Sequence, residues 1–150
     1  MRRARLAAVA FALGALSVAG CGGGNGGLSN EELIAQADAI CEEYERRTEG
    51  VATPEGFEDI ERFAAETRTL IQEAVNELAG LKPPEELAED YDRWIAQNEE
   101  NLGLLEEVES AAAEGDEARV RDLLGEAQQA GARTDRLARE IGFQECGTLD

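Results

Sequence analysis

The sequence contains no histidine, and this absence excludes several kinds of site at once. Ser-His-Asp triads and Cys-His pairs need an imidazole as the base. Histidine-ligated zinc and haem, and the Glu-x-x-His pairs of di-iron helical bundles, need it as a ligand. Lysine is almost absent too, since Lys82 is the only one. We therefore expect a protein that is not an enzyme and that carries no cofactor.

Patterns for other kinds of site are also missing. There is no Cys-x-x-Cys pair that would lower a thiol pKa, and no EF-hand spacing for calcium. The glycine-rich stretch 22–27 is not followed by the Lys-Ser/Thr pair of a phosphate-binding loop. Adjacent glutamates such as Glu99 and Glu100 point about 100° apart on a helix. They do not face a common substrate, so acid catalysis by paired carboxylates is not indicated.

Positive charge is scarce, because 33 acidic residues stand against 14 basic ones and the net charge is −19. Such a chain repels nucleic acid, whose binding depends on neutralising phosphates with Lys and Arg. It also repels anionic lipid headgroups, so membrane residence would need a covalent anchor. We interpret the acidity as a solvated surface that keeps an exported protein soluble. A cationic partner or loosely held divalent ions are the alternatives.

The amino terminus has the composition of an export signal. Residues 1–5 carry three arginines, and residues 6–20 form an apolar run without charge. This run is shorter than the roughly 20 residues that a membrane-spanning helix needs. A basic start followed by a short apolar segment is typical of a secretory signal peptide.

The apolar run ends in Val18-Ala19-Gly20-Cys21. This stretch resembles the lipobox of bacterial lipoproteins, and the resemblance implies diacylglyceryl transfer to the Cys21 thiol and cleavage after Gly20. Cleavage would remove three basic residues and no acid, leaving 11 against 33 and a net charge of −22. An ordinary secretory signal with a chance cysteine and an uncleaved anchor helix are the alternatives.

Three regions follow from this interpretation: residues 1–20 are a cleaved signal peptide, residues 21–28 are the lipidated cysteine with a flexible glycine-rich linker, and residues 29–150 are one folded domain. We expect the protein at the extracytoplasmic face of the cell membrane, held by the lipid on Cys21.

Apolar residues recur three or four positions apart through the whole domain, which predicts amphipathic helices. We expect four helices, at about 30–48, 54–80, 83–114 and 116–142. Ser29 and Glu32 have capping-box spacing, and prolines precede the second and third helices. No segment alternates with a period of two. The fold class is therefore all-α, and short connections favour an antiparallel up-down-up-down four-helix bundle.

Two cysteines remain once Cys21 is assigned to the lipid. Cys41 lies on the apolar face of the first helix, and Cys146 lies just beyond the fourth. These helices are neighbours in such a bundle, and disulfides persist outside the cytoplasm. We therefore predict a structural Cys41–Cys146 disulfide. A redox pair and two independent thiols are the alternatives.

Aromatic residues are few, and Tyr91 and Trp94 both fall on the apolar stripe of the third helix. Aromatic residues at helical spacing usually fill a core, but a ligand groove lined by Tyr91, Trp94 and Asn98 is the alternative. Asn98, Thr67 and Thr134 are polar residues on apolar stripes. They either form a buried hydrogen-bonded layer or lie at the edges of the stripes. The stripe of the fourth helix is predicted to include Val120, Leu123, Leu124, Ala127, Leu137 and Ile141.

Several short stretches carry a likeness to a known group of proteins: Ala37-Asp38-Ala39-Ile40-Cys41, Leu81-Lys82-Pro83-Pro84, Tyr91-Asp92-Arg93, Gly115-Asp116 and Cys146-Gly147. Through them the chain from 29 to 146 resembles small helical lipoproteins of high-GC Gram-positive bacteria. The resemblance implies an architecture and supplies no catalytic residue. We expect a non-catalytic interaction module that binds another envelope protein, and a small-ligand binder with a pocket near Trp94 is the alternative.

Overall fold

The computed structural model describes residues 26–147, and all regular structure in this range is helical. The signal peptide, Cys21 and most of the linker lie outside the described residues, so the predictions made for them stay predictions. The elements in chain order are α1 (Asn30–Thr48), the 3₁₀ turn η1 (Phe57–Asp59), α2 (Ile60–Ala79), α3 (Ala88–Ala113) and α4 (Glu117–Ile141). The predicted all-α class is confirmed for this part of the chain.

The first helix begins as its sequence predicts. The Ser29 hydroxyl accepts a hydrogen bond from the Glu32 backbone N–H at 3.3 Å, and the Glu32 carboxylate accepts one from the Ser29 N–H at 3.0 Å. This reciprocal capping box satisfies two N–H groups that a helix start otherwise leaves unpaired. The helix ends at Thr48, just before Gly50.

The second and third helices begin later than predicted. Pro54 does not open a helix, because Gly56 is extended (φ −151°, ψ 177°) and the 3₁₀ turn η1 follows before α2 begins at Ile60. The Pro83-Pro84 pair likewise opens a turn, in which the Leu87 N–H donates to the Pro84 carbonyl at 3.0 Å. The third helix therefore begins at Ala88. In both places the prolines introduce a turn that leads into the helix.

Both ends of the fourth helix are confirmed. The Asp116 carboxylate caps the start by accepting the Arg119 backbone N–H at 2.9 Å. At the other end Gly142 adopts φ +108°, a left-handed conformation that glycine reaches without a steric penalty.

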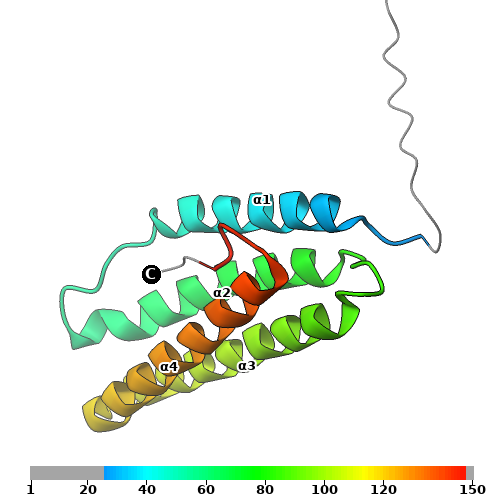
Figure 1. Ribbon diagram of the computed structural model, residues 1–150. Coiled ribbons are helices and arrows are strands. Elements are labelled where there is room, and N and C mark those ends of the chain that lie inside the picture. Colours follow the sequence, from blue (N-terminus) through cyan, green and yellow to red (C-terminus); the bar gives the residue numbers. More distant parts are fainter. Residues whose placement is uncertain (1–25, 148–150) are drawn as a thin grey trace, which may run out of the picture.

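The helices pack in a chain of contacts in which α2 lies along α3, α3 lies along α4, and α1 lies against α2 (Figure 1). From the end of α4 the carboxyl-terminal tail, residues 142–147, crosses to α1 (Figure 1). None of the helices within residues 26–147 is long and apolar enough to span a bilayer.

The buried hydrophobic residues form two groups. The first core cluster takes residues from all four helices and the tail, namely Leu33, Ala37, Cys41, Leu78, Tyr91, Trp94, Ala138, Ile141, Phe143 and Cys146. The second core cluster takes residues from α2, α3 and α4 only, namely Ala64, Val108, Ala111, Val120 and Leu123. The contribution of α1 to the core is therefore confined to one end of the domain.

Leu124 corrects one prediction for the buried stripes. It is 46% exposed and is the only large hydrophobic residue of the described chain with such exposure. Its predicted neighbours Val120, Leu123 and Ile141 are buried. Leu124 follows Leu123 by one residue, and this step rotates it away from the core by about 100°.

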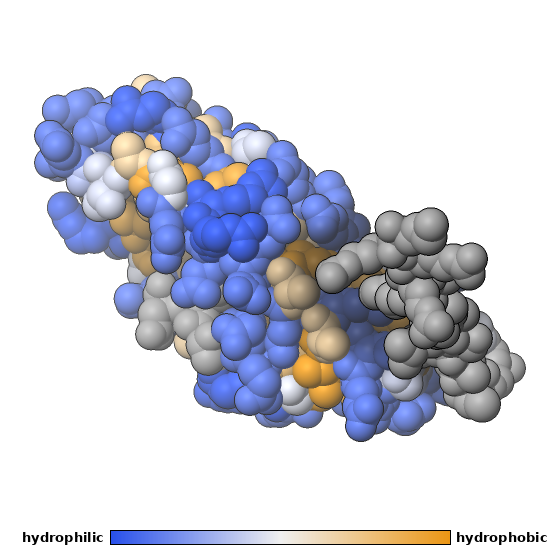
Figure 2. Space-filling model, turned by 90° about the horizontal axis from the view of Figure 1, so that it is seen from above, coloured by the Kyte–Doolittle hydropathy of each residue, from blue (hydrophilic) through white to orange (hydrophobic). Residues whose placement is uncertain are grey.

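Hydrophilic side chains cover most of the face of the molecule shown in Figure 2, and hydrophobic ones show only in narrow patches.

Candidate functional site

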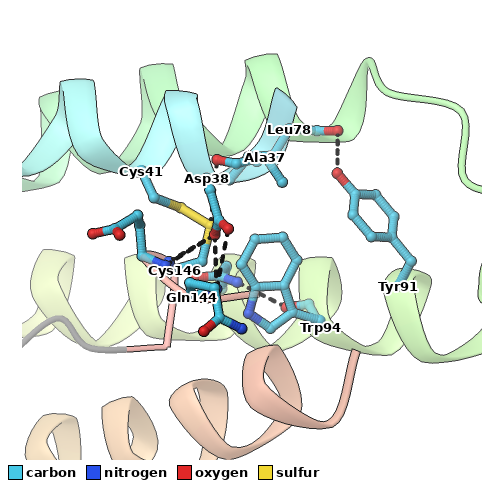
Figure 3. The surroundings of a disulfide bond; sticks show 10 residues. Ala37, Asp38, Cys41, Leu78, Tyr91, Trp94, Gln144 and Cys146 are labelled. Atoms are coloured by element: carbon cyan, nitrogen blue, oxygen red, sulfur yellow. Dashed lines mark hydrogen bonds between the residues drawn. A yellow bond between two sulfur atoms is a disulfide. The ribbon is translucent and has the colours of Figure 1, made fainter. Parts of the chain in front are cut away.

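The best-defined constellation of the domain surrounds the junction of α1, α3 and the tail (Figure 3). Cys41 on α1 and Cys146 in the tail form a disulfide, with an S–S distance of 2.07 Å and a Cα–Cα distance of 5.2 Å. The predicted disulfide is thus confirmed. Both cysteines are buried and belong to the first core cluster.

Asp38, one turn before Cys41, binds the same tail. Its carboxylate accepts hydrogen bonds from three consecutive backbone N–H groups, those of Gln144 (3.1 Å), Glu145 (3.0 Å) and Cys146 (3.3 Å) (Figure 3). These groups follow the end of α4 and have no helical partners of their own. Asp38 therefore supplies the acceptor that the tail backbone needs, as a charged group gives stronger hydrogen bonds than a neutral one.

Three aromatic rings, two from α3 and one from the tail, pack together. Phe143 lies 4.9 Å from Trp94 and 6.2 Å from Tyr91, measured between ring centroids, and Tyr91 and Trp94 are 5.6 Å apart. The angles between rings are tilted or edge-to-face, the arrangements that aromatic quadrupoles favour. All three side chains are almost completely buried.

The polar atoms of these rings differ in their partners. The Tyr91 hydroxyl donates to the Leu78 carbonyl at 2.7 Å (Figure 3), and burial, with a smaller contribution from Asp92, raises the pKa of Tyr91 above its usual value. The Trp94 indole Nε1 is buried without a hydrogen-bond partner among the described residues. The indole therefore contributes to the core through apolar packing and not through a hydrogen bond to a described residue.

The predicted ligand-binding residues are placed by these contacts. Tyr91 and Trp94 lie side by side as predicted, and Phe143 packs against both, so all three rings belong to the first core cluster. Asn98 is half-buried, and its side-chain amide donates to the Trp94 carbonyl of its own helix at 2.9 Å. It does not join the two rings in a common site.

Phe143 was missed by the sequence reasoning, which ended at the helix stop Gly142. A signal for it exists: a hydrophobic residue directly after a left-handed glycine often folds back onto the last turn of the helix. Here the Phe143 N–H donates to the Ala138 carbonyl at 3.0 Å, which turns the side chain toward the core.

A polar pair on α3 and α4 stands apart from both core clusters. The Asn101 side-chain amide donates to the Thr134 hydroxyl at 2.9 Å, and this hydroxyl donates to the Ala130 carbonyl at 3.2 Å. Thr134 is thus a buried polar residue as one alternative predicted, but its hydrogen-bond partner on α3 is Asn101, whereas Asn98 bonds to the backbone of its own helix. The Asn101 Oδ1 atom is buried without a partner.

A surface cleft of about 230 Å³ lies where the amino-terminal segment meets the α2–α3 connection. It is lined by Gly26, Gly27, Leu28, Gln36, Gly80, Leu81 and Lys82. The Leu28 N–H donates to the Lys82 carbonyl at 2.8 Å and holds the two segments together. None of the predicted ligand-binding residues lines this cleft.

The acidic side chains do not converge. Within residues 26–147 no group of three or more His, Cys, Asp or Glu side chains is arranged to hold a metal ion. The carboxyls with a shifted pKa have it lowered by local hydrogen bonds, at Glu32 from Ser29 and at Asp59 first from the Glu55 backbone and then from Arg62. The lowered pKa keeps both groups ionised, and at Glu32 the charged form accepts the hydrogen bond that caps α1.

Comparisons of the chain with protein-family models, with curated proteins and with solved structures found no match. The resemblance to small helical lipoproteins therefore rests on the sequence stretches alone.

Proposed function

We propose that the protein is a lipid-anchored module at the extracytoplasmic face of the cell membrane, which acts by binding an envelope protein and does not catalyse a reaction. The observation that carries the proposal is the buried Cys41–Cys146 disulfide. Disulfides are rare in the reducing cytoplasm and common outside it. A disulfide in the folded domain and an export signal before it are two independent features that agree.

We also infer that the four helices form an antiparallel up-down-up-down bundle. Consecutive helices pack against each other, and the connections 80–87 and 114–116 are short, which favours antiparallel neighbours. The tail that crosses from α4 to α1 supports the closure of this bundle, since the disulfide and Asp38 join the first and last elements.

Binding of a small ligand near Trp94 is less well supported. Phe143, with 1% of its surface exposed, occupies the space beside Trp94 and Tyr91 that a ligand would need. The surface limits which partner can bind, because Leu124 is the only exposed large hydrophobic residue in the described range. A partner would therefore meet a mainly polar surface.

Lipid attachment is tested by growing cells that make the full-length protein with an alkyne-tagged fatty acid. We expect the wild-type protein to incorporate the tag and Cys21→Ala to lose it. The double variant Cys41→Ala/Cys146→Ala is the matched control, since it removes the other two cysteines and should keep the tag. Unlabelled wild-type protein, or labelled Cys21→Ala, would contradict the anchor.

The partner is tested by crosslinking the wild-type protein in intact cells and identifying the crosslinked peptides by mass spectrometry. We expect peptides of an envelope protein joined to exposed side chains of the domain. A result with no partner peptide, under conditions that crosslink a known envelope complex in the same cells, would count against an interaction module.

A further inference from the structure

One end of the domain lies close along the chain to the cysteine that would carry the lipid. The structure describes the chain from Gly26, and residues 22–25 stand between Gly26 and Cys21. An extended chain spans at most about 3.6 Å per residue, so it can place Cys21 no more than about 18 Å from Gly26. A lipid on Cys21 would therefore hold Gly26 within this distance of the membrane surface.

The segment that begins at Gly26 is fixed to the connection between α2 and α3. The Leu28 N–H donates to the Lys82 carbonyl at 2.8 Å, and the Leu28 side chain packs against the first core cluster. A Cβ atom added at Gly27 would lie 3.0 Å from the Pro83 carbonyl oxygen, so the two backbones are in close contact there. We call residues 26–29 and 80–87 the anchor end, because the tether is attached to the folded domain at this point.

The opposite end of the domain is far from this attachment point. Helix α3 follows the connection 80–87 and contains 26 residues, which gives a length of about 39 Å at 1.5 Å per residue. It leads to the turn 114–116, which we call the outer end. Figure 1 shows the amino-terminal segment and the connection 80–87 at one end of the molecule and the turn 114–116 at the other. The domain is thus tethered at one end of its long dimension.

The charge of the helices does not draw the sides of the domain to a bilayer. Acidic residues outnumber basic ones on α1, α2 and α3, and α4 carries five of each. Anionic headgroups repel an acidic surface. A domain lying on the side of α1, α2 or α3 would bring many like charges close to the membrane, whereas a domain standing on the anchor end would not.

The anchor end carries one basic side chain. Lys82 is exposed and takes part in none of the ion pairs within residues 26–147, so its ammonium group is available to a headgroup phosphate. Glu85 and Glu86 of the same connection are also exposed. Charge alone would therefore not hold this end at an anionic surface, and the tether must do so.

We propose that the anchor end is the surface of the domain that meets the phospholipid headgroups, so that the domain stands on the membrane with its outer end directed away from it. This inference rests on the lipid anchor proposed above for Cys21. Lys82 then lies beside the headgroup phosphates, and the cleft lined by Gly27, Leu81 and Lys82 lies on the membrane side of the domain.

The orientation is tested with Glu85→Cys and Glu114→Cys in the full-length lipidated protein, each labelled with a fluorophore on the new thiol. The two variants make the same substitution at exposed residues near opposite ends of α3, and Cys41 and Cys146 do not compete for the label because they form a disulfide. The vesicles contain phosphatidylcholine, phosphatidylglycerol and a lipid with a nitroxide quencher on its headgroup. We expect several-fold stronger quenching at residue 85 than at residue 114.

Flotation of the vesicles separates this inference from the anchor on which it rests. Protein that does not float with the vesicles would contradict the lipid anchor, and the orientation would be wrong with it. Protein that floats but is quenched equally at both positions, or more strongly at residue 114, would leave the anchor in place and overturn the orientation.

The role of the tether is tested by inserting a flexible Gly/Ser segment of about 20 residues after Gly24. The root-mean-square reach from Cys21 to the folded domain would then rise from about 12 Å to about 28 Å. We expect quenching at residue 85 to fall several-fold, and the same segment added after Asp150 is the matched control that should leave it unchanged. Undiminished quenching with the longer tether would overturn the proposal, since the tether would then not hold the anchor end at the membrane.

Discussion

Asp38 is the residue on which the position of the tail depends most directly. Three consecutive N–H groups of the tail donate to its carboxylate, and water would have to satisfy them if the carboxylate were removed. We expect Asp38→Ala to lower the free energy of unfolding by about 1–2 kcal/mol, as typical for hydrogen bonds to a partly exposed charged group. Urea denaturation of the oxidised protein measures this. Glu42→Ala, on the exposed side of the same helix, should change it by less than about 0.5 kcal/mol.

The two tyrosines provide a pH-dependent test of burial. Burial raises the pKa of Tyr44 to about 12 and raises the pKa of Tyr91 as well, compared with about 10 in an unfolded chain. The folded state thus favours the neutral phenols. Their contribution to stability is complete below about pH 10 and is lost as the pH rises through the folded values.

We therefore expect the folded protein, at a pH between 10 and the higher value of about 12, to show much less phenolate absorbance than the urea-denatured chain. Ultraviolet absorbance titration of both states measures the difference. Coincident titration curves would mean that both side chains are solvated in the folded state.

Single residues also show where sequence reasoning stops. Cys41 and Cys146 could be paired in advance, because helix faces and an even cysteine count leave few choices. Asn101 could not be chosen over Asn98 as the partner of Thr134, since both lie near the same apolar stripe and only the packing of α3 on α4 separates them. The prediction that Leu124 is buried was wrong for a similar reason. The sequence of one helix does not show how far its buried stripe extends, because this depends on how the neighbouring helices pack against it.

At the scale of elements, capping signals were more reliable than prolines. The starts of α1 and α4 were predicted correctly because Ser29 and Asp116 bond directly to backbone N–H groups of the first turn. The helix starts predicted from the prolines were wrong for α2 and α3, which begin later, at Ile60 and Ala88. Proline fixes only its own φ, and this value suits a turn as well as a helix.

Substitution by alanine is predicted to have opposite effects on stability at two glycines, because one is helical and the other has a left-handed backbone conformation. Gly103 lies inside α3, where an added Cβ would meet nothing within 4 Å, so Gly103→Ala should raise the free energy of unfolding by about 0.5–1 kcal/mol. Gly142 ends α4 at φ +108°, and Gly142→Ala should lower it by about 1 kcal/mol or more. Thermal denaturation of both variants compares them. A loss of stability in Gly103→Ala would show that this face of α3 is covered.

For the whole molecule, the two core clusters differ in whether they include residues of the tail. The first core cluster needs α1 and Phe143 to close it, whereas the second is built from α2, α3 and α4 alone. The sequence predicted the apolar stripes that make both clusters. It could not predict their division, because the length over which α1 contacts α2 depends on where the connection 49–59 leads the chain.

The disulfide should be the largest single contribution to global stability. It joins residues that are 105 positions apart, and closing a loop of this size in the unfolded chain contributes about 4–5 kcal/mol on the chain-entropy model. We expect reduction to lower the free energy of unfolding by up to this amount. Guanidinium denaturation with and without reductant measures it, and identical midpoints would show that the bridge contributes nothing.

The same bond closes most of the domain into a covalent ring that runs from Cys41 through three helices to Cys146. A protease that cuts the exposed connection after α1, or the turn between α3 and α4, would open the ring without releasing a fragment. The two pieces would stay joined to each other through the sulfur atoms of Cys41 and Cys146. The domain would thus remain a single molecule after one proteolytic cut.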